Sequence, residues 1–109
     1  MSIIVTGSRN WVSKRHLYNV LDDISPTGII VGDCKTGADL FARQYAKEHR
    51  IKLIVYTANW NEYGISAGPK RNTAMIRDNV DDVSLVVAFF QEGERNAGTT
   101  NCVKTAEKY

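Results

Sequence analysis

The chain alternates short apolar runs with segments of helical period, and this alternation constrains its fold more than any other feature. The apolar runs lie at residues 2–6, 28–33, 52–57 and 83–90. Most of each run is continuously apolar instead of alternating with polar residues, as expected of strands covered on both faces. Strands joined by helices form right-handed crossovers. The pattern therefore predicts a three-layer α/β sandwich with a parallel sheet of four to five strands.

Helices are predicted from apolar residues that recur at helical spacing and from proline. Two helices follow the first and second strands, and their apolar faces comprise Leu17, Val20, Leu21 and Ile24 in one and Ala38, Phe41, Ala42, Tyr45 and Ala46 in the other. A third helix is predicted from about Pro69, because proline suits a first helical position. Met75 is then a predicted core contact, and a last short helix begins at about Thr99.

The length of the chain indicates one small domain spanning residues 1–109, because 109 residues support one modest hydrophobic core. A net charge of +2 does not demand a polyanion across a whole face. Cys34 and Cys102 fit no metal or redox spacing, so we expect free thiols. We also expect no metal and no cofactor. No signal peptide or membrane-length apolar run is visible, so we expect a cytoplasmic protein.

A polar, glycine-containing cluster follows each predicted strand, at residues 6–11, 32–39, 59–72 and 93–101. Parallel strands end at one edge of a sheet, and ligands of open α/β sheets bind at that edge. In the first cluster Gly7, Ser8 and Arg9 have the chemistry of a phosphate-binding turn. The alternative is a turn whose glycine serves only the backbone and whose arginine is solvated.

In the second cluster Gly32 and Gly37 flank a turn, and Thr36 is a candidate helix cap. Asp39 would lie in the first turn of the following helix, where a carboxylate is favoured by about 0.3–1 kcal/mol. A functional alternative is a carboxylate that holds a ribose hydroxyl or an arginine from a neighbouring loop.

The third cluster places Lys70 and Arg71 at a predicted helix start, where cations oppose the helix dipole. Glu62 across the loop is one candidate partner for Arg71. An external anion that rests on the helix amides and Arg71 satisfies more groups at once, and we prefer that interpretation.

The fourth cluster repeats glycine plus hydroxyls at a helix start, in Gly98, Thr99 and Thr100. Its hydroxyls either cap the helix or hold a phosphate. Trp11 and Trp60 lie beside these clusters and either stack on a base or pack in the protein.

Taken in order, the segments VTGSR, VGDCKTGAD, AGPKRNTAM and GTT resemble the SLOG superfamily, which includes the LOG hydrolases and the Smf/DprA DNA-processing proteins. The resemblance is greatest to the small YspA-type branch, often carried by phages and other mobile elements. It implies a Rossmann-like sheet, a pocket for a nucleotide or nucleotide-derived ligand, self-association, and the host cytoplasm if a phage encodes the chain. Open sheet edges also favour a homo-oligomer.

LOG hydrolases cut the N-glycosidic bond of nucleoside monophosphates, and their R-K-x-x-M segment is similar to Arg71-Asn72-x-x-Met75. The resemblance implies that Arg71 is catalytic if this chain is such a hydrolase. The position of the LOG glutamate holds Cys102, and a thiol replaces a catalytic carboxylate poorly. Glu92, Glu94 or Asp39 are other sources of a carboxylate.

The leading hypothesis is therefore a protein that binds a nucleotide or nucleotide-derived signal, as a sensor or a sponge. Two alternatives stay open: a nucleotide N-glycosidase, and a DNA-processing accessory protein that binds single strands through a basic groove with aromatics. The predicted base-stacking residues are Trp11 and Trp60, and the predicted ligand-binding residues are Gly7, Ser8, Arg9, Gly32, Asp33, Gly37, Asp39, Gly68, Pro69, Arg71, Asn72, Gly98, Thr99 and Thr100.

Overall fold

A computed structural model of the chain describes residues 1–64, 67–89, 103 and 106–107. Each predicted strand is present, and its observed bounds differ from the predicted ones by at most one residue. The predicted last helix lies largely outside the described residues, although residues 103, 106 and 107 are helical. The elements in chain order are β1 (Ser2–Gly7), α1 (Lys14–Ile24), β2 (Gly28–Gly32), α2 (Gly37–Glu48), β3 (Lys52–Tyr56), α3 (Trp60–Tyr63), α4 (Ala67–Asn79) and β4 (Val83–Phe89).

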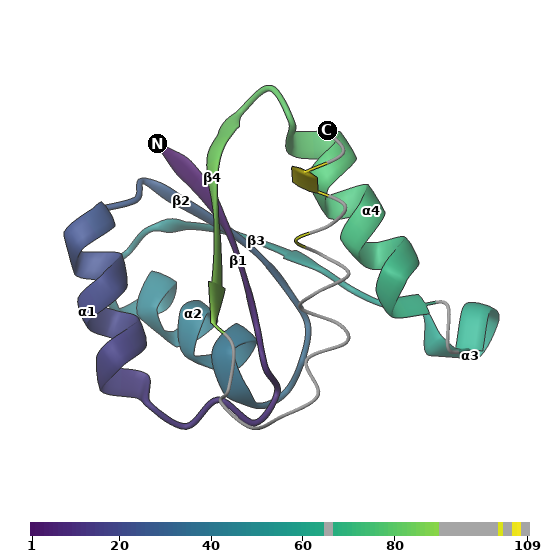
Figure 1. Cartoon of the computed structure of the whole chain (residues 1–109), viewed down its shortest axis with the longest axis horizontal. Helices are drawn as coiled ribbons and strands as arrows, with labels where there is room; N and C mark the ends of the chain where they lie inside the picture. Colours follow the sequence, from purple (N-terminus) through teal and green to yellow (C-terminus); the bar gives the residue numbers. More distant parts are fainter. Residues whose placement is uncertain (65–66, 90–102, 104–105, 108–109) are drawn as a thin grey trace.

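The four strands form one parallel sheet in the order β3-β2-β1-β4 (Figure 1). The register pairs Ile3 of β1 with Ile29 of β2, and Ile29 with Leu53 of β3. The chain builds outward from β1 to β3 and then places β4 on the other side of β1. The switch in strand order therefore lies between β1 and β4.

Helices cover both faces of this sheet, which confirms the predicted three-layer α/β arrangement (Figure 1). Successive residues of β1 point to opposite faces. Ile3 and Val5 pack with α1 and α2, whereas Ile4 packs with Met75 of α4. Met75 is 1% exposed, so its predicted core position is confirmed. Because both faces are buried, the central strands read as continuous apolar runs.

Helix α4 begins at Ala67, two residues before the predicted start at Pro69. Pro69 is therefore the third residue of the helix, still in the first turn, where its missing N–H costs nothing. Lys70 and Arg71 become the fourth and fifth residues. The conflict that we inferred between these cations and first-turn amides is correspondingly smaller, because the dipole effect falls off within that turn.

Membrane insertion is not supported by any described helix, since none is both long and apolar enough to cross a bilayer.

Candidate functional site

Four charged side chains converge where β2 ends, and we call them the β2 charge cluster: Asp33, Asp39, Arg43 and Arg71. At its centre Nη1 of Arg71 donates a hydrogen bond to Oδ1 of Asp33 at 2.9 Å. The two side chains are 15% and 30% exposed, so the ion pair is partly shielded from solvent. Asp33 directly follows β2 and Arg71 lies on α4, so the pair ties that helix to the sheet edge.

The protein group that pairs with Arg71 is not Glu62, which was one candidate partner from the sequence. Oε2 of Glu62 accepts a hydrogen bond from Nδ2 of Asn59 at 3.0 Å, within the segment that leads into α3. The alternative that paired Glu62 with Arg71 is therefore wrong, and Asp33 is an internal anion beside Arg71. The reason is topological, because α4 packs over the end of β2, where Asp33 is located.

Asp33 also connects the ends of two strands. Its second oxygen, Oδ2, accepts a hydrogen bond from the backbone amide of Ala58 at 3.3 Å. Ala58 follows β3, so the Asp33 carboxylate connects the end of β2 with the segment after β3 and with α4. On the other side of the guanidinium, Nε of Arg71 donates to Oδ1 of Asn72 at 3.2 Å. Asp33 and Arg71 are thus both oriented from two directions.

Asp39 and Arg43 bring the first half of α2 into the cluster. Asp39 is 6% exposed, and burial raises the pKa of its carboxyl to about 6, against the opposing effects of Arg71, the Cys34 amide and Arg43. Its Oδ2 accepts the Cys34 amide at 3.4 Å. Nη1 of Arg43 donates to the backbone carbonyl of Gly32 at 3.0 Å. The predicted contact between Asp39 and an arginine from another segment is therefore electrostatic, and involves Arg71.

Gly32 makes this convergence possible. A Cβ at position 32 would lie 2.8 Å from Oδ2 of Asp39 and 2.9 Å from Cζ of Arg71. Real Cβ atoms do not approach other atoms so closely, and both neighbours are charged groups of the cluster. The glycine therefore lets the two side chains meet over the end of the strand.

The loop after β1 is bonded to the start of α2, beside the cluster. The carbonyl of Ser8 accepts hydrogen bonds from the amides of Trp11 and Ala38, each at 3.1 Å. The hydroxyl of Thr36 donates to the carbonyl of Arg9 at 2.8 Å and makes no cap hydrogen bond. Thr36 therefore is the N-cap residue of α2, as expected, but its hydroxyl bonds the neighbouring loop instead of the helix amides.

The first cluster of the sequence, Gly7 to Arg9, has mostly structural contacts. A Cβ at Gly7 would lie 2.8 Å from the carbonyl oxygen of Phe89, so the glycine allows close packing at the switch between β1 and β4. The amide of Ser8 donates to the same carbonyl at 2.9 Å, and its Oγ accepts from the amide of Asn10 at 3.1 Å. Arg9 is exposed. The structure therefore favours the backbone role for Gly7 and leaves Arg9 as the accessible charge.

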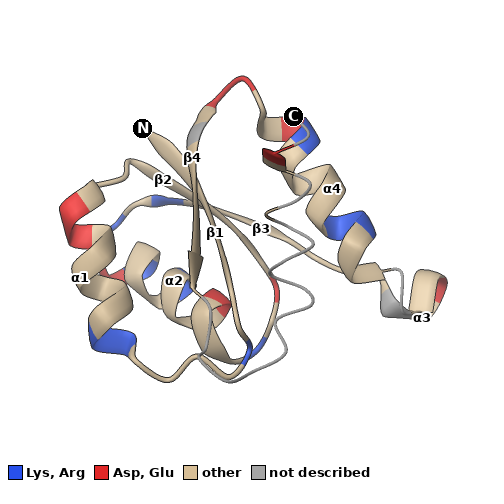
Figure 2. Cartoon of the chain, in the orientation of Figure 1, with Lys and Arg blue, Asp and Glu red and all other residues tan. Residues whose placement is uncertain are grey.

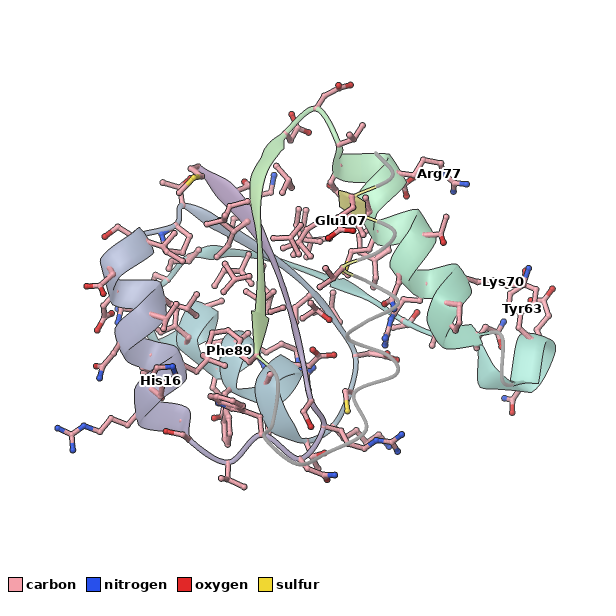
Figure 3. The ribbon with its side chains drawn as sticks, in the orientation of Figure 1. His16, Tyr63, Lys70, Arg77, Phe89 and Glu107 are labelled. Carbon is pink, nitrogen blue, oxygen red and sulfur yellow. The ribbon has the colours of Figure 1, made fainter. Side chains whose placement is uncertain are left out.

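Trp11 is a packing residue in this structure. Its ring centroid lies 5.4 Å from that of Phe89 and 5.8 Å from that of His16, two residues labelled in Figure 3. Its Nε1 donates to the carbonyl of Ser13 at 3.0 Å. These contacts support the packing alternative over base stacking.

Several predicted residues cannot be placed at the cluster. Lys70 points to the ring of Tyr63, with Nζ 4.8 Å from the ring centroid (Figure 3). Gly68 is buried in α4 and Pro69 is exposed, whereas the buried Asn72 does contact the cluster through its hydrogen bond from Arg71. The side chain of Trp60 and the residues Gly98, Thr99, Thr100 and Cys102 lie outside the described residues.

Two groups at the site, Arg43 and the backbone amide of Ala58, were not predicted from the sequence. Arg43 lies four residues after Asp39, which places both on one face of α2, so helical spacing could have found it. The amide of Ala58 carries no such signal, because any residue at that position supplies it.

A separate cavity of about 410 Å³ lies at the opposite edge of the sheet. Its lining includes Met1, Thr27, Lys52, Asn79 and Asp82, near the amino ends of the strands. The Met1 ammonium already donates to Oγ1 of Thr27 at 2.7 Å. We place the candidate site at the β2 charge cluster, because ligands of such sheets bind at the carboxyl edge and because four charged side chains gather there, among them the buried Asp39 with its raised pKa.

Comparison with known proteins adds two findings. The model of the YspA, cpYpsA-related SLOG family matches residues 1–63, which is more than half of the chain. The gene 61 protein of Mycobacterium phage D29 is 32% identical over 116 aligned residues, which cover 97% of this chain and 88% of that protein. No solved structure gives a significant match. The matched segment contains Asp33, Asp39 and Arg43, and Arg71 lies beyond it.

Proposed function

The chain belongs to the YspA, cpYpsA-related SLOG family, and from that premise we propose that it binds a nucleotide or nucleotide-derived ligand at the carboxyl edge of its sheet. Family membership indicates a nucleotide-related function. The observation that carries the finer proposal is the convergence of Asp33, Asp39, Arg43 and Arg71 at the end of β2. A sensor or a sponge for a signalling nucleotide fits such a site.

A contribution to folding stability does not by itself explain why four charged side chains gather at the end of β2. Shielded ion pairs gain little net free energy, because removing charges from water offsets their attraction. A buried carboxyl with a raised pKa at a ligand-binding edge is instead typical of functional sites. Asp39 has this property and lies within the electrostatic influence of two arginines.

The chemistry of the cluster matches the parts of a nucleotide. A guanidinium presents a planar fork of donors that suits phosphate oxygens, so we propose that Arg71 binds the phosphate of the ligand. Carboxylates accept hydrogen bonds from hydroxyls, so Asp33 or Asp39 is the proposed ribose partner. The exposed Arg9 lies in the loop bonded to α2 and supplies further positive charge.

Single-stranded DNA receives less support as a ligand. Figure 2 shows basic and acidic residues together on α1, α2 and α4, instead of one basic stripe along these described helices. A groove that tracks a nucleic-acid backbone needs a concentration of positive charge.

The decisive test is mass spectrometry of the ligands that the protein retains. The protein is incubated with nucleotides, cyclic nucleotides and ADP-ribose derivatives, freed of unbound molecules and denatured. We expect an intact nucleotide to be released by the wild type and by Arg77→Ala, and at least tenfold less by Arg71→Ala. Arg77 is the matched control, because it lies on the same helix, is exposed and points outward (Figure 3). Equal retention by Arg71→Ala and the wild type contradicts the proposed site.

A nucleotide N-glycosidase is the second candidate, and the raised pKa of Asp39 is the observation that favours it. A carboxyl that holds its proton near pH 6 is suited to general acid catalysis. Hydrolysis would add water across the glycosidic bond and release a free base and a sugar phosphate. The same mass spectra distinguish the candidates, because a binder releases only intact nucleotide, and Asp39→Asn should abolish any base release.

A further inference from the structure

Arg71, the group proposed to hold the ligand's phosphate, already holds an anion that belongs to the protein. Oδ1 of Asp33 lies 2.9 Å from Nη1 of Arg71, a distance typical of a charge-assisted hydrogen bond. The Asp33 carboxylate is kept in place by the Ala58 amide, which bonds its other oxygen. A phosphate that approaches Nη1 must therefore exchange with a carboxylate that the fold positions.

The charges of the cluster make this exchange necessary. Arg43 and Arg71 carry two positive charges, and Asp33 and Asp39, when ionised, carry two negative charges. The formal sum is zero, so the cluster offers no excess positive charge to attract an anion. Because the pair is mostly shielded from solvent, salt screens it less than a surface pair.

We propose that Asp33 is a built-in competitor of the ligand, which occupies Arg71 until an anionic group of the ligand displaces it. This inference rests on the proposed function of the site. When only a fraction of molecules has Arg71 available, the apparent affinity falls by that fraction. The competitor also defines the ligand class, since a neutral nucleoside offers nothing that can replace a carboxylate on a guanidinium. The ligand must present at least one phosphate to Arg71.

Asp33→Asn is the informative variant. The amide side chain keeps an oxygen that can accept the Ala58 hydrogen bond, and it removes the charge that holds Arg71. Asp81→Asn is the matched control, because Asp81 is exposed just beyond α4 and the substitution changes the net charge equally. Thermal unfolding of both variants verifies that they fold.

The first measurement is calorimetric titration of the wild type and both variants with AMP and with adenosine. We expect Asp33→Asn to bind AMP about tenfold more tightly than the wild type, the effect of removing one shielded charged partner. Adenosine binding should be the same in all three proteins, and Asp81→Asn should match the wild type throughout. Weaker binding of both AMP and adenosine by Asp33→Asn would overturn the inference, because Asp33 would then hold the ribose.

A second measurement needs no ligand and separates this inference from the proposed function. Phenylglyoxal modifies accessible arginines, and peptide mass spectrometry reports its rate at Arg71. We expect faster modification of Arg71 in Asp33→Asn than in the wild type or Asp81→Asn. Equal rates would overturn the inference even if AMP binds. If no nucleotide of the retention pool binds while the rates differ as expected, the nucleotide proposal fails and the occupancy of Arg71 by Asp33 stands.

Discussion

Arg71 and Asp33 are 38 residues apart in sequence, yet Nη1 of the first lies 2.9 Å from Oδ1 of the second. This contact joins α4 to the end of β2 across the layer boundary. A second arginine of the same helix offers a contrast. Arg77 pairs with its neighbour Asp78 at 3.6 Å, and both side chains are about half exposed or more. The Arg71–Asp33 pair is thus shielded from solvent and the Arg77–Asp78 pair lies at the surface, so the two can be compared for their contribution to stability.

A double-mutant cycle on unfolding should distinguish the two pairs. Removal of Arg71 leaves the partly buried Asp33 without its partner, so we expect a coupling free energy of about 1–2 kcal/mol between Arg71→Ala and Asp33→Ala. The surface pair, Arg77→Ala with Asp78→Ala, should show a coupling below about 0.5 kcal/mol. Urea denaturation of the six variants measures both values, and equal couplings would show that the cluster pair is as solvated as a surface pair.

The titration of Asp39 should make its contribution to stability depend on pH. Burial raises the pKa of Asp39 to about 6 in the folded state, above its ordinary value of 3.8, although Arg71 and Arg43 oppose the shift and Asp33 adds to it. A raised folded pKa gives stability that is present at low pH and is lost as the pH rises through about 6. The wild type should therefore lose about 2 kcal/mol relative to Asp39→Asn between about pH 4 and pH 7.5.

The measurement for Asp39 is urea denaturation of both proteins across this range. Because the other titrating groups are common to both, the difference between the two free energies of unfolding isolates position 39. A difference that does not change with pH would mean that the carboxyl titrates normally in the folded protein.

Local patterns were sufficient to predict the layers of this fold. The strands are apolar runs because helices cover both faces of the sheet, and the helical spacing of Leu17 and Leu21 places both in the core. The glycine-containing clusters were expected at the carboxyl edge, and Gly32 and Gly37 are located there at close backbone or side-chain approaches. Periodicity and strand order are properties of neighbouring residues and of topology, so sequence reasoning captures them.

The partners of individual side chains could not be predicted in the same way. Glu62 was a candidate partner of Arg71 because it is near in sequence. Packing of α4 over β2 instead brings Asp33 within hydrogen-bonding distance of Arg71. Thr36 is the N-cap residue of α2 as expected, but the sequence did not indicate that its hydroxyl would donate to the Arg9 carbonyl. Such contacts depend on how segments distant in sequence approach each other. Self-association and the roles of Gly98, Thr99 and Thr100 stay predictions.

Docking of α4 on the sheet should depend on Met75. Its side chain is 1% exposed and packs with Ile4, Ile30 and Ile76, so truncation would leave a cavity in the second core layer. We expect Met75→Ala to lower the free energy of unfolding by about 3 kcal/mol. Val80→Ala is the control, since Val80 is 44% exposed, and should change stability by less than about 0.5 kcal/mol. Similar losses in chemical denaturation would show that α4 is not packed as described.

Two glycines with positive φ angles should respond very differently to alanine. Gly37 and Gly64 have φ angles of 73° and 56°, so alanine at either position is strained by about 1 kcal/mol. A Cβ at Gly37 would also collide with the backbone of Ser8 and Arg9, whereas none of the described atoms lies within 4 Å of a Cβ at Gly64. That collision would push the loop after β1 away from the start of α2.

We therefore expect Gly64→Ala to lower the free energy of unfolding by about 1 kcal/mol and Gly37→Ala by about 3 kcal/mol, because overpacking adds to the backbone strain. Urea denaturation of the two variants gives both values. Nucleotide retention adds a second comparison, since only Gly37→Ala displaces the loop that carries Arg9 beside the β2 charge cluster. Equal stability losses would mean that the two loops are not held together at Gly37, and the geometry of the carboxyl edge would need revision.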